Sequence, residues 1–372
     1  MTSNQPTAAV APASSGTTDG PVYDVVVIGG GQAGLSMAWH LQRHGLRFQI
    51  LEAGPEIGHV WRARWDTLTL FSPARYDSLP GLPFPAPDDS YPGKDAVADY
   101  LTAYAATFEL PVRLNSRVTR LRRADGLFEL VTAGGTVRTR QVVVATGPFQ
   151  TPFIPPVARE MAPDVHQLHS SDYRNPEALP DGPALVVGAG NSGLQIAGEL
   201  VRSRDVDLAV GSASPALPQR LLGRDLFWWL TKLHLIGKPA DSRLGRRMRT
   251  RGEFTIGSNR KQLAAAGVRF RSRVTAAEGS SVALADGTTV TPRSVIWATG
   301  FRPDYSWLDV DGVFAEGHVR HTSGVTEVPG LYFLGLSWQR SRGSALLGFV
   351  ADDAAPLADQ IARRASVPSQ GA

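Results

Sequence analysis

The stretch YDVVVIGGGQAGLSMAWHLQRHG, Tyr23–Gly45, decides how this chain folds. Its apolar run Val25–Ile28 is typical of a strand that is buried on both faces of a parallel sheet. Glycines in the spacing GxGxxG follow, and Ala33–His44 has the apolar spacing of a helix. A strand, a glycine turn and a helix in this order predict a dinucleotide-binding unit, in which amide groups at the helix N-terminus hold the phosphates. The predicted contacts are Gly29, Gly31, Gln32, Ala33 and Gly34.

A carboxylate, Glu52, comes directly after the next predicted strand, Phe48–Leu51. At this spacing from the glycine turn, an acid accepts hydrogen bonds from the ribose hydroxyls of a dinucleotide. The same acid repels a 2′-phosphate. The first site therefore suits FAD or NAD rather than NADP.

The chain repeats this construction in ALVVGAGNSGLQIAGEL, Ala184–Leu200. Ala184–Val187 is the predicted strand, Asn191–Arg202 is the predicted helix, and Val206–Val210 is the strand that follows. The predicted contacts of this second site are Gly188, Gly190, Asn191, Ser192 and Gly193.

No acid follows the strand that ends at Val210. A hydroxyl side chain, Ser212, stands there instead, and Arg220 comes a little later. A hydroxyl and a cation accept a 2′-phosphate, so Ser212 and Arg220 favour NADPH over NADH at the second site. In the alternative interpretation, Ser212–Pro215 is only a polar turn and Arg220 is an ordinary surface residue.

An ATG ending follows each fingerprint, in VVVATGPF at Val142–Phe149 and in VIWATGFRPDYSWL at Val295–Leu308. Val112–Val143 alternates apolar and polar residues, as an antiparallel meander does. Near the C-terminus, a strand at Leu331–Leu336 and a helix near Phe349–Arg363 are predicted to return to the first unit. We therefore expect an α/β fold with two Rossmann-like dinucleotide-binding domains. The expected boundaries are 1–20 for a disordered tail, 21–160 and 290–365 for an FAD-binding domain, 161–289 for an inserted NADPH-binding domain, and 366–372 for a flexible tail.

Composition limits the class of protein. The 372 residues include no cysteine, which excludes disulfides, thiolate metal ligands and a CxxC redox relay, and fits a cytoplasmic location. The formal net charge of +4 is small for this length and does not indicate nucleic-acid binding. No apolar run is long enough to span a bilayer, and the N-terminus lacks a signal pattern.

Two segments leave several interpretations open. The basic stretch Ser242–Arg251 is either a patch for an anionic partner or a solvated helix face. The apolar, helix-like stretch Leu221–Gly237 forms a lid, a substrate entrance, a homodimer contact, a membrane-surface contact or ordinary core.

Together these motifs resemble those of the class B flavin-containing monooxygenases, in particular compact bacterial members and the plant indole-pyruvate monooxygenases. The resemblance extends from Tyr23 to about Arg364 and includes His169 and Tyr173 of HSSDYRNP, which keep the spacing of the family motif before the second fingerprint. Pro163 and Val165 depart from that motif. The segment LTLFSPARY lacks the asparagine that many members place near the flavin. His169 and Tyr173 are expected to orient the interdomain linker.

The resemblance implies that NADPH reduces bound FAD and that O₂ then forms a C4a-hydroperoxyflavin. One oxygen atom would pass to a small nitrogen or sulfur nucleophile or to a keto acid, so no catalytic side chain and no metal is assigned. Two alternatives stay open. An NADPH oxidase-like flavoprotein would release peroxide, and a redox-responsive nucleotide-binding regulator would act through a partner.

Further side chains are expected to line the flavin. Candidates for positive charge are Arg62, Arg64 and Arg342, assisted by a helix N-terminus after Arg342–Phe349. Trp61 and Trp338 could cover the ring, although packing and surface ion pairing explain each of these residues equally well. The remaining predicted cofactor contacts are Val118, Gly147 and Gly300.

Overall fold

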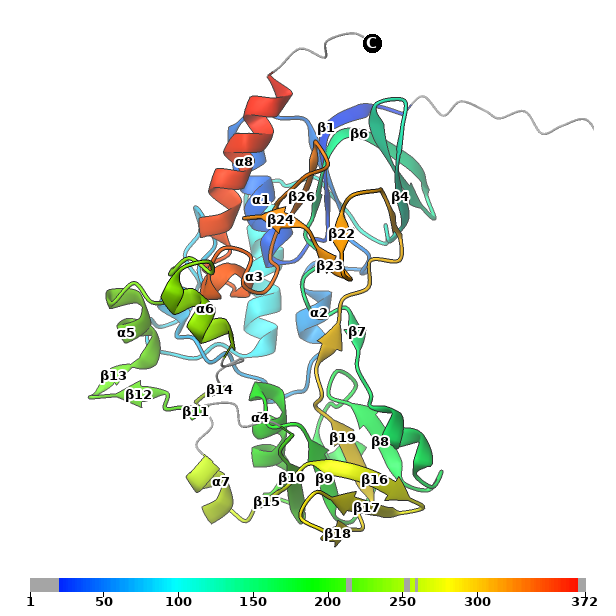
Figure 1. The fold of residues 1–372 in the computed structure, drawn as a ribbon. Coiled ribbons are helices and arrows are strands. Elements are labelled where there is room, and N and C mark those ends of the chain that lie inside the picture. The colour runs from blue at the N-terminus through cyan, green and yellow to red at the C-terminus, as the bar shows by residue number, and fades with distance from the viewer. Residues whose placement is uncertain (1–19, 212–215, 251–254, 258–259, 367–372) are drawn as a thin grey trace, which may run out of the picture.

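A computed structural model describes residues 20–211, 216–250, 255–257 and 260–366. The predicted tails at 1–20 and 366–372 lie almost wholly outside the described residues. The described chain forms a larger unit and a smaller unit, each built around its own sheet (Figure 1).

The larger sheet has the strand order β21-β4-β5-β6-β1-β2-β3, and β26 also pairs with β6. Strand β1 lies between two parallel partners, β6 and β2. Its side chains alternate between two cores, because Val25 and Val27 face the helices α1, α3 and α8, whereas Val26 and Ile28 face the meander. This two-sided burial explains why the buried part of the strand, Val25–Ile28, is wholly apolar. The strands are β1 (Val22–Ile28), β2 (Phe48–Leu51), β3 (Val112–Arg113), β4 (Val118–Ala124), β5 (Leu127–Thr132), β6 (Gly135–Val144), β21 (Leu308–Asp309), β24 (His321–Thr322), β25 (Val325–Thr326) and β26 (Leu331–Phe333).

Among the helices of the larger unit, the first and the last lie within two residues of their predicted ranges, whereas the second, a single turn, lies in a segment that was expected to be irregular. The helices are α1 (Gln32–Arg43), α2 (His59–Arg62), α3 (Lys94–Thr107) and α8 (Ala351–Ala365). Helix α8 packs against α1, so the C-terminus completes the core that the N-terminus begins (Figure 1). Val112–Arg113 does not belong to the meander, because it pairs in parallel with β2 at the edge of the sheet. Short elements are the 3₁₀ turns η1 (Ala74–Tyr76) and η4 (Arg342–Ala345) and the hairpin β22 (Phe314–Ala315) and β23 (His318–Val319).

The smaller sheet is wholly parallel, with the order β15-β10-β9-β19-β8. Its strands are β8 (His166–His169), β9 (Ala184–Val187), β10 (Val206–Ala209), β15 (Arg269–Arg271) and β19 (Ser294–Trp297), and its helices are α4 (Asn191–Leu200) and α7 (Arg260–Ala265). A meander of β16 (Val274–Glu278), β17 (Ser281–Leu284) and β18 (Thr289–Val290) follows β15, and the 3₁₀ turns η2 (Pro156–Glu160) and η3 (Pro176–Ala178) flank β8. Because β19 completes this sheet, the chain returns to the larger unit after Trp297 and not at residue 290.

Two connections join the units, and they pair with each other. The outgoing strand β7 (Thr151–Pro152) lies antiparallel to the returning strand β20 (Phe301–Arg302) (Figure 1).

The segment Leu221–Gly237 is helical only in part. Helix α5 covers Leu226–Lys232, because Asp225 caps its N-terminus by accepting a hydrogen bond from the amide of Phe227 (2.7 Å). Before it, β12 (Arg220–Leu221) and β13 (Arg224–Asp225) form a hairpin. Nearby lie α6 (Arg243–Thr250) and the parallel pair β11 (Ala216–Leu217) and β14 (Thr255–Ile256).

Candidate cofactor sites

The two glycine turns are built alike. Gly31 and Gly190 cap α1 and α4 with nearly the same backbone angles, φ −79° and ψ −172° against φ −76° and ψ −176°. A Cβ at Gly34 would lie 1.9 Å from the carbonyl oxygen of Gly29. The equivalent distance from Gly193 to the oxygen of Gly188 is also 1.9 Å. No side chain fits at the third glycine of either turn.

The ATG endings explain the first glycine of each turn. Gly29 has φ +108°, and a Cβ there would lie 2.6 Å from the carbonyl oxygen of Ala145. Gly188 has φ +111°, and its Cβ would lie 2.3 Å from the oxygen of Ala298. Each ATG strand therefore ends directly beneath a glycine turn. Gly147 and Gly300, with φ +71° and +82°, then turn the chain away.

Both cradles are open to an anion. A Cβ at Gly31 or Gly190 would meet no atom within 4 Å. Neither α1 nor α4 has a side-chain cap or an acid in its first turn. No capping side chain therefore accepts hydrogen bonds from the amide groups of that turn. Gln32 and Ala33 begin α1, and Asn191 and Ser192 begin α4. These turns fit a pyrophosphate at each helix N-terminus.

Glu52 is held beside the first turn. Its Oε2 accepts a hydrogen bond from the amide of Gly30 (2.6 Å), and its Oε1 accepts one from Gly54 (2.7 Å). An ionised carboxylate has about four acceptor positions, so two remain for ribose hydroxyls. Val118 is buried in the same core cluster as Leu51, and the amide of Ser116 donates to the backbone oxygen of Glu52 (2.7 Å).

The second site has no acid in the place of Glu52. Strand β10 ends at Ala209, Gly211 is exposed, and Ser212 lies outside the described residues. Arg220 does not lie beside Gly211. It lines a small cavity with Arg75 and Asp89 of the larger unit.

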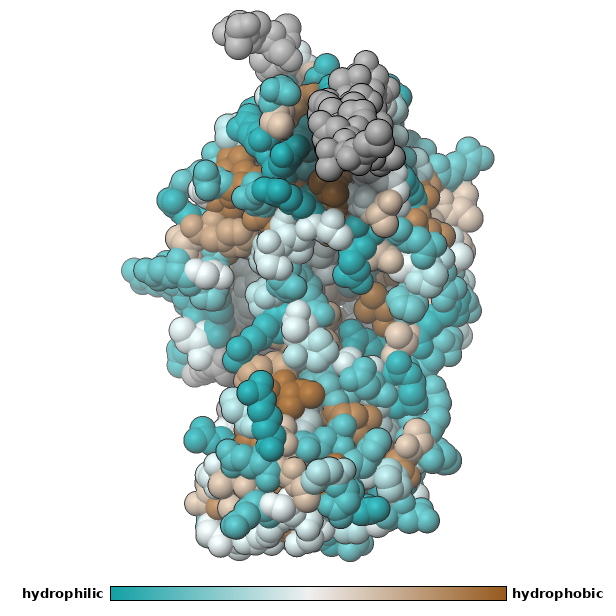
Figure 2. All heavy atoms as spheres, turned by 90° about the vertical axis from the view of Figure 1, so that its right-hand side faces the viewer, coloured by the Kyte–Doolittle hydropathy of each residue, from teal (hydrophilic) through white to brown (hydrophobic). Residues whose placement is uncertain are grey.

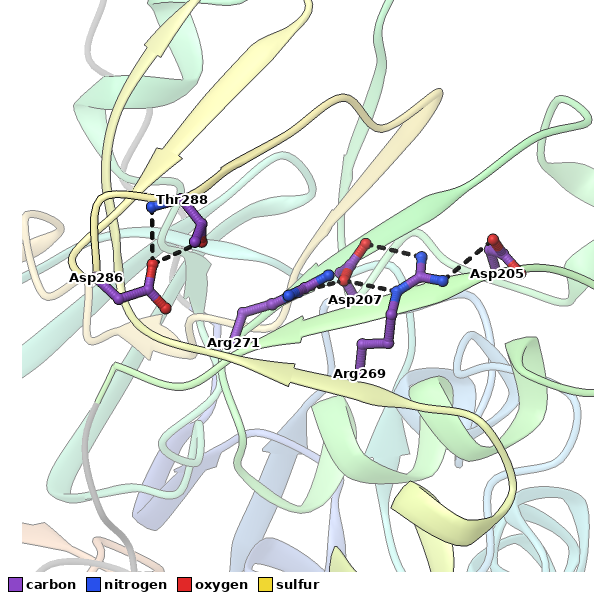
Figure 3. Close-up of polar contacts among 6 residues, drawn as sticks. All are labelled: Asp205, Asp207, Arg269, Arg271, Asp286 and Thr288. Atoms are coloured by element: carbon purple, nitrogen blue, oxygen red, sulfur yellow. Dashed lines mark hydrogen bonds and ion pairs between the residues drawn. The ribbon is translucent and has the colours of Figure 1, made fainter.

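An arginine ladder runs along β15, next to β10. Figure 3 shows Asp207 of β10 accepting hydrogen bonds from Arg269 (3.0 and 3.1 Å) and Arg271 (2.6 Å), while Asp205 also pairs with Arg269 (3.1 Å). These arginines lower the pKa of Asp207 against the opposing effect of burial. The positive charges of Arg269 and Arg271 are thus balanced by aspartates of the protein itself.

The third arginine of the ladder is the residue that sequence reasoning missed. Arg273 is exposed, and its Cγ and Cδ lie 4.0 Å from the place that a Cβ of Gly211 would take. No ion pair joins Arg273 to an acid among the residues that the structure describes. The nearby Asp286 is engaged by Thr288, whose amide (3.0 Å) and hydroxyl (2.6 Å) donate to it (Figure 3). The alternation at 269, 271 and 273 was visible in the sequence, but its register against β10 was not.

The side chains expected around the flavin ring have mixed surroundings. Arg62 is committed to acids, at 2.7 Å from Asp99 and 3.4 Å from Glu56. Arg64 is different, because burial lowers its pKa and its guanidinium lies 5.4 Å from the ring centre of Phe301 in the returning connection. Trp61 packs against the main core of the larger unit.

Trp338 and Arg342 lie together, with the guanidinium 5.8 Å from the indole centre. Their loop reaches the first turn, since a Cβ at Gly335 would lie 3.0 Å from the Cβ of Ala33. The helix that follows starts at Ala351, with Asp352 and Asp353 in its first turn. These acids occupy the positive end of the helix dipole, which weakens the expected role of that N-terminus in stabilising an anionic flavin.

His169 and Tyr173 have structural partners. His169 Nε2 bonds the backbone oxygen of Gly300 (2.9 Å) and so ties β8 to the returning connection, while burial lowers its pKa. Tyr173 is fully buried, and its hydroxyl donates to Glu199 of α4 (2.9 Å). Both residues join elements rather than face open space.

Asp77 is a buried carboxyl that the sequence did not single out. It follows LTLFSPARY and is 1% exposed. The hydroxyl of Ser72 donates to its Oδ1 (2.5 Å), while Oδ2 has no partner among the described residues. Burial raises the pKa of Asp77 to about 7.

Across the described ranges, no group of three or more His, Cys, Asp or Glu side chains could hold a metal ion. None of the described helices has the length and apolarity that crossing a membrane requires.

Comparisons with known proteins agree with this architecture. The family model for pyridine nucleotide-disulphide oxidoreductases matches residues 26–216. An uncharacterized CzcO-like oxidoreductase of Geobacillus kaustophilus is 44% identical over 342 residues, which cover 91% of this chain and 98% of that protein. Indole-3-pyruvate monooxygenase YUCCA8 of Oryza sativa subsp. indica is 28% identical over 92% of this chain and 90% of its own length.

The solved structure of a flavin-containing monooxygenase from Stenotrophomonas maltophilia superposes with a TM-score of 0.77 at 31% identity, covering 92% of this chain and 98% of that one. The two glycine cradles, the two ATG strands and these relatives lead to one assignment: the chain is a flavin-dependent oxidoreductase and belongs to the class B flavin-containing monooxygenase family.

Proposed function

We propose that the protein is an FAD-dependent, NADPH-consuming monooxygenase. One atom of O₂ passes to a small nitrogen or sulfur nucleophile or to a keto acid, and the other leaves as water with two electrons from NADPH. Bound FAD would supply the electron transfer and the activation of oxygen. The proposal rests on a comparison of the two glycine turns. The turns themselves are alike, but Glu52 stands beside the first, where a ribose would bind, and no acid stands in the same place at the second.

The first cradle is the proposed FAD site. Its amides and the carboxylate of Glu52 suit a pyrophosphate and an unmodified ribose. The remaining proposed contacts follow the sequence expectation, with Trp61, Trp338 and Arg342 beside the ring and Val118 and Gly147 near the nucleotide. Arg64 is the best supported of the proposed cations, because it is half-buried and no salt bridge to it is found among the described residues.

The second cradle is the proposed NADPH site. Arg273 replaces Arg220 as the proposed partner of the 2′-phosphate, because it stands at the end of β15 against Gly211 without a neutralising acid. Arginine suits this role, since its guanidinium matches phosphate geometry. Ser212 stays a proposed partner of the same phosphate.

The proposed role of the remaining protein groups is to position the two cofactors and to shield them from water. Gln150 donates to Gly147 (2.9 Å) and accepts from the amide of Asp304 (2.6 Å), and so holds the two connections between the units together. These bonds would help to hold the two glycine turns in a constant relative position. Hydride transfer between two bound cofactors requires such a fixed geometry.

Rapid kinetics test the proposal. The purified flavoprotein is reduced anaerobically with NADPH and then mixed with O₂, with and without candidate amines, thioethers and keto acids. We expect one of them to yield an oxygenated product in proportion to NADPH consumed. Stoichiometric peroxide with every substrate would instead identify an NADPH oxidase, in line with the missing asparagine of LTLFSPARY. Binding of both nucleotides without turnover would identify a regulator.

A further inference from the structure

The hairpin β12–β13 carries apolar side chains into solvent. Leu222 at its tip is 82% exposed, and Leu221 is 46% exposed. The hairpin is held in place, because the indole Nε1 of Trp229 donates to the backbone oxygen of Leu221 (2.9 Å). Leu233, the residue directly after α5, is a further exposed apolar residue (55% exposed). We call residues 220–250 the hairpin face.

The hairpin face is also strongly basic. It contains eight Lys and Arg residues and two Asp residues, a net charge of +6. The whole chain carries +4, so all other residues together carry −2. One of the two acids, Asp225, is buried and occupied by Tyr91 (2.6 Å), Gln219 (2.9 Å) and the cap of α5.

These cations have no acidic partners within the described ranges. The ion pairs of the structure involve residues before and after the hairpin face, and none includes its lysines or arginines. Arg224 instead lies over Trp228, 5.5 Å from the ring centre. Helix α6, which lies near α5 in Figure 1, carries Arg243, Arg246, Arg247 and Arg249, all of them exposed, and only its Gly245 is buried.

The opposite side of the molecule can be compared by the hydropathy of its surface. Figure 2 turns that side to the viewer, and there hydrophilic residues predominate while apolar ones lie in scattered patches. Other large apolar residues, such as Phe149 (62% exposed), also reach solvent, but Leu221 and Leu222 do so from a fixed hairpin that belongs to a strongly basic segment.

We propose that the hairpin face docks the protein on an anionic membrane surface. Leu221 and Leu222 would enter the boundary between headgroups and acyl chains, and the arginines would pair with lipid phosphates. A second copy of the chain is a poorer occupant, because it would place one charge of +6 against another. A nucleic acid would satisfy the arginines but leave both leucines in water. The proposal does not depend on the oxygenation chemistry.

Vesicle cosedimentation tests the docking. The flavin-loaded protein is mixed with vesicles of phosphatidylcholine alone and of an equal mixture of phosphatidylcholine and phosphatidylglycerol, at low and high salt. We expect binding to the mixed vesicles only, and weaker binding at high salt. The double variant Arg246→Ala/Arg247→Ala should partition about 30-fold more weakly, since each surface cation contributes about a factor of five to six.

A second variant separates the apolar contribution. Leu221→Ser/Leu222→Ser should lower partitioning by roughly 100-fold without changing its salt dependence. Arg117→Ala/Arg159→Ala removes two exposed arginines elsewhere and should bind like the wild type. Flavin absorbance and circular dichroism report whether each variant is folded.

Three outcomes would overturn the proposal: equal binding to both vesicle types, binding to neither, or hairpin variants that bind like the wild type. If the wild type and the leucine variant retard duplex DNA in a gel and the arginine variant does not, the hairpin face binds nucleic acid instead. Loss of a dimer in the leucine variant alone would assign it to a second copy.

Discussion

Replacing Asp77 with asparagine should abolish one contribution to the pH dependence of stability. Asp77 is 1% exposed, and burial raises its pKa from 3.8 to about 7. Between these values the folded protein holds a proton on Asp77 that the unfolded chain has lost. Unfolding therefore releases a proton, and the contribution of Asp77 to stability is full below the unfolded pKa and is lost as pH rises through the folded pKa. Asparagine cannot ionise, so Asp77→Asn removes this loss.

The magnitude follows from the two pKa values. Between about pH 5 and pH 8, the wild type should lose about 2.5 kcal/mol of unfolding free energy relative to Asp77→Asn. Urea unfolding followed by tryptophan fluorescence, at a fixed FAD concentration, measures this difference at each pH. Because every other titrating group is shared, the difference between the two proteins isolates Asp77.

Parallel pH profiles would refute this reasoning. They would mean that Asp77 is ionised in the folded protein and that its unpartnered Oδ2 finds a donor, such as a group of the bound cofactor. A wild type that gains stability with pH relative to the variant would show a lowered pKa and would contradict the burial argument outright.

Three further variants test the cofactor sites. In Gly34→Ala the new methyl group would lie 1.9 Å from the oxygen of Gly29, so the purified protein should lack the flavin absorbance band; normal flavin content would be incompatible with this turn. Arg273→Ala should weaken NADP⁺ binding roughly tenfold in calorimetry and leave NAD⁺ binding unchanged, whereas equal losses would remove the 2′-phosphate role. Tyr173→Phe leaves Glu199 without its hydroxyl donor and should cost about 1–3 kcal/mol of stability at unchanged turnover; a change in turnover with intact stability would place Tyr173 at the substrate.

The sequence predicted those parts of the protein that depend on short spacings. Both fingerprints and the strands beside them lie within a residue or two of their expected places, because buried strands and glycine turns are encoded locally. The parts that it missed depend on tertiary register. Arg273 reaches Gly211 only because β15 lies beside β10. Likewise, the segment Leu221–Gly237 looks like one helix until Asp225 is seen to cap α5.

Two of the groups expected near the flavin have acids beside them in the structure. Arg62 was a candidate for the flavin, but acids of its own unit hold it. The helix after Arg342–Phe349 was expected to offer a positive end, yet the two aspartates of its first turn occupy that end. A single sequence does not reveal that Arg62 meets Asp99 of another helix, whereas the aspartates of α8 stand in that helix's own first turn and were visible in the sequence.

The return of the chain to the larger sheet sets the order in which the protein can be completed during synthesis. The strands of the smaller sheet all lie between His166 and Trp297, so they leave the ribosome before the C-terminal strand and helix of the larger unit. The core beneath Gly29 combines Val27 with Tyr332, Leu357 and Ile361 from the far end of the chain. During translation the smaller sheet can therefore form before α8 is made. The first glycine turn, although it is synthesised first, lacks part of its supporting core until α8 has left the ribosome.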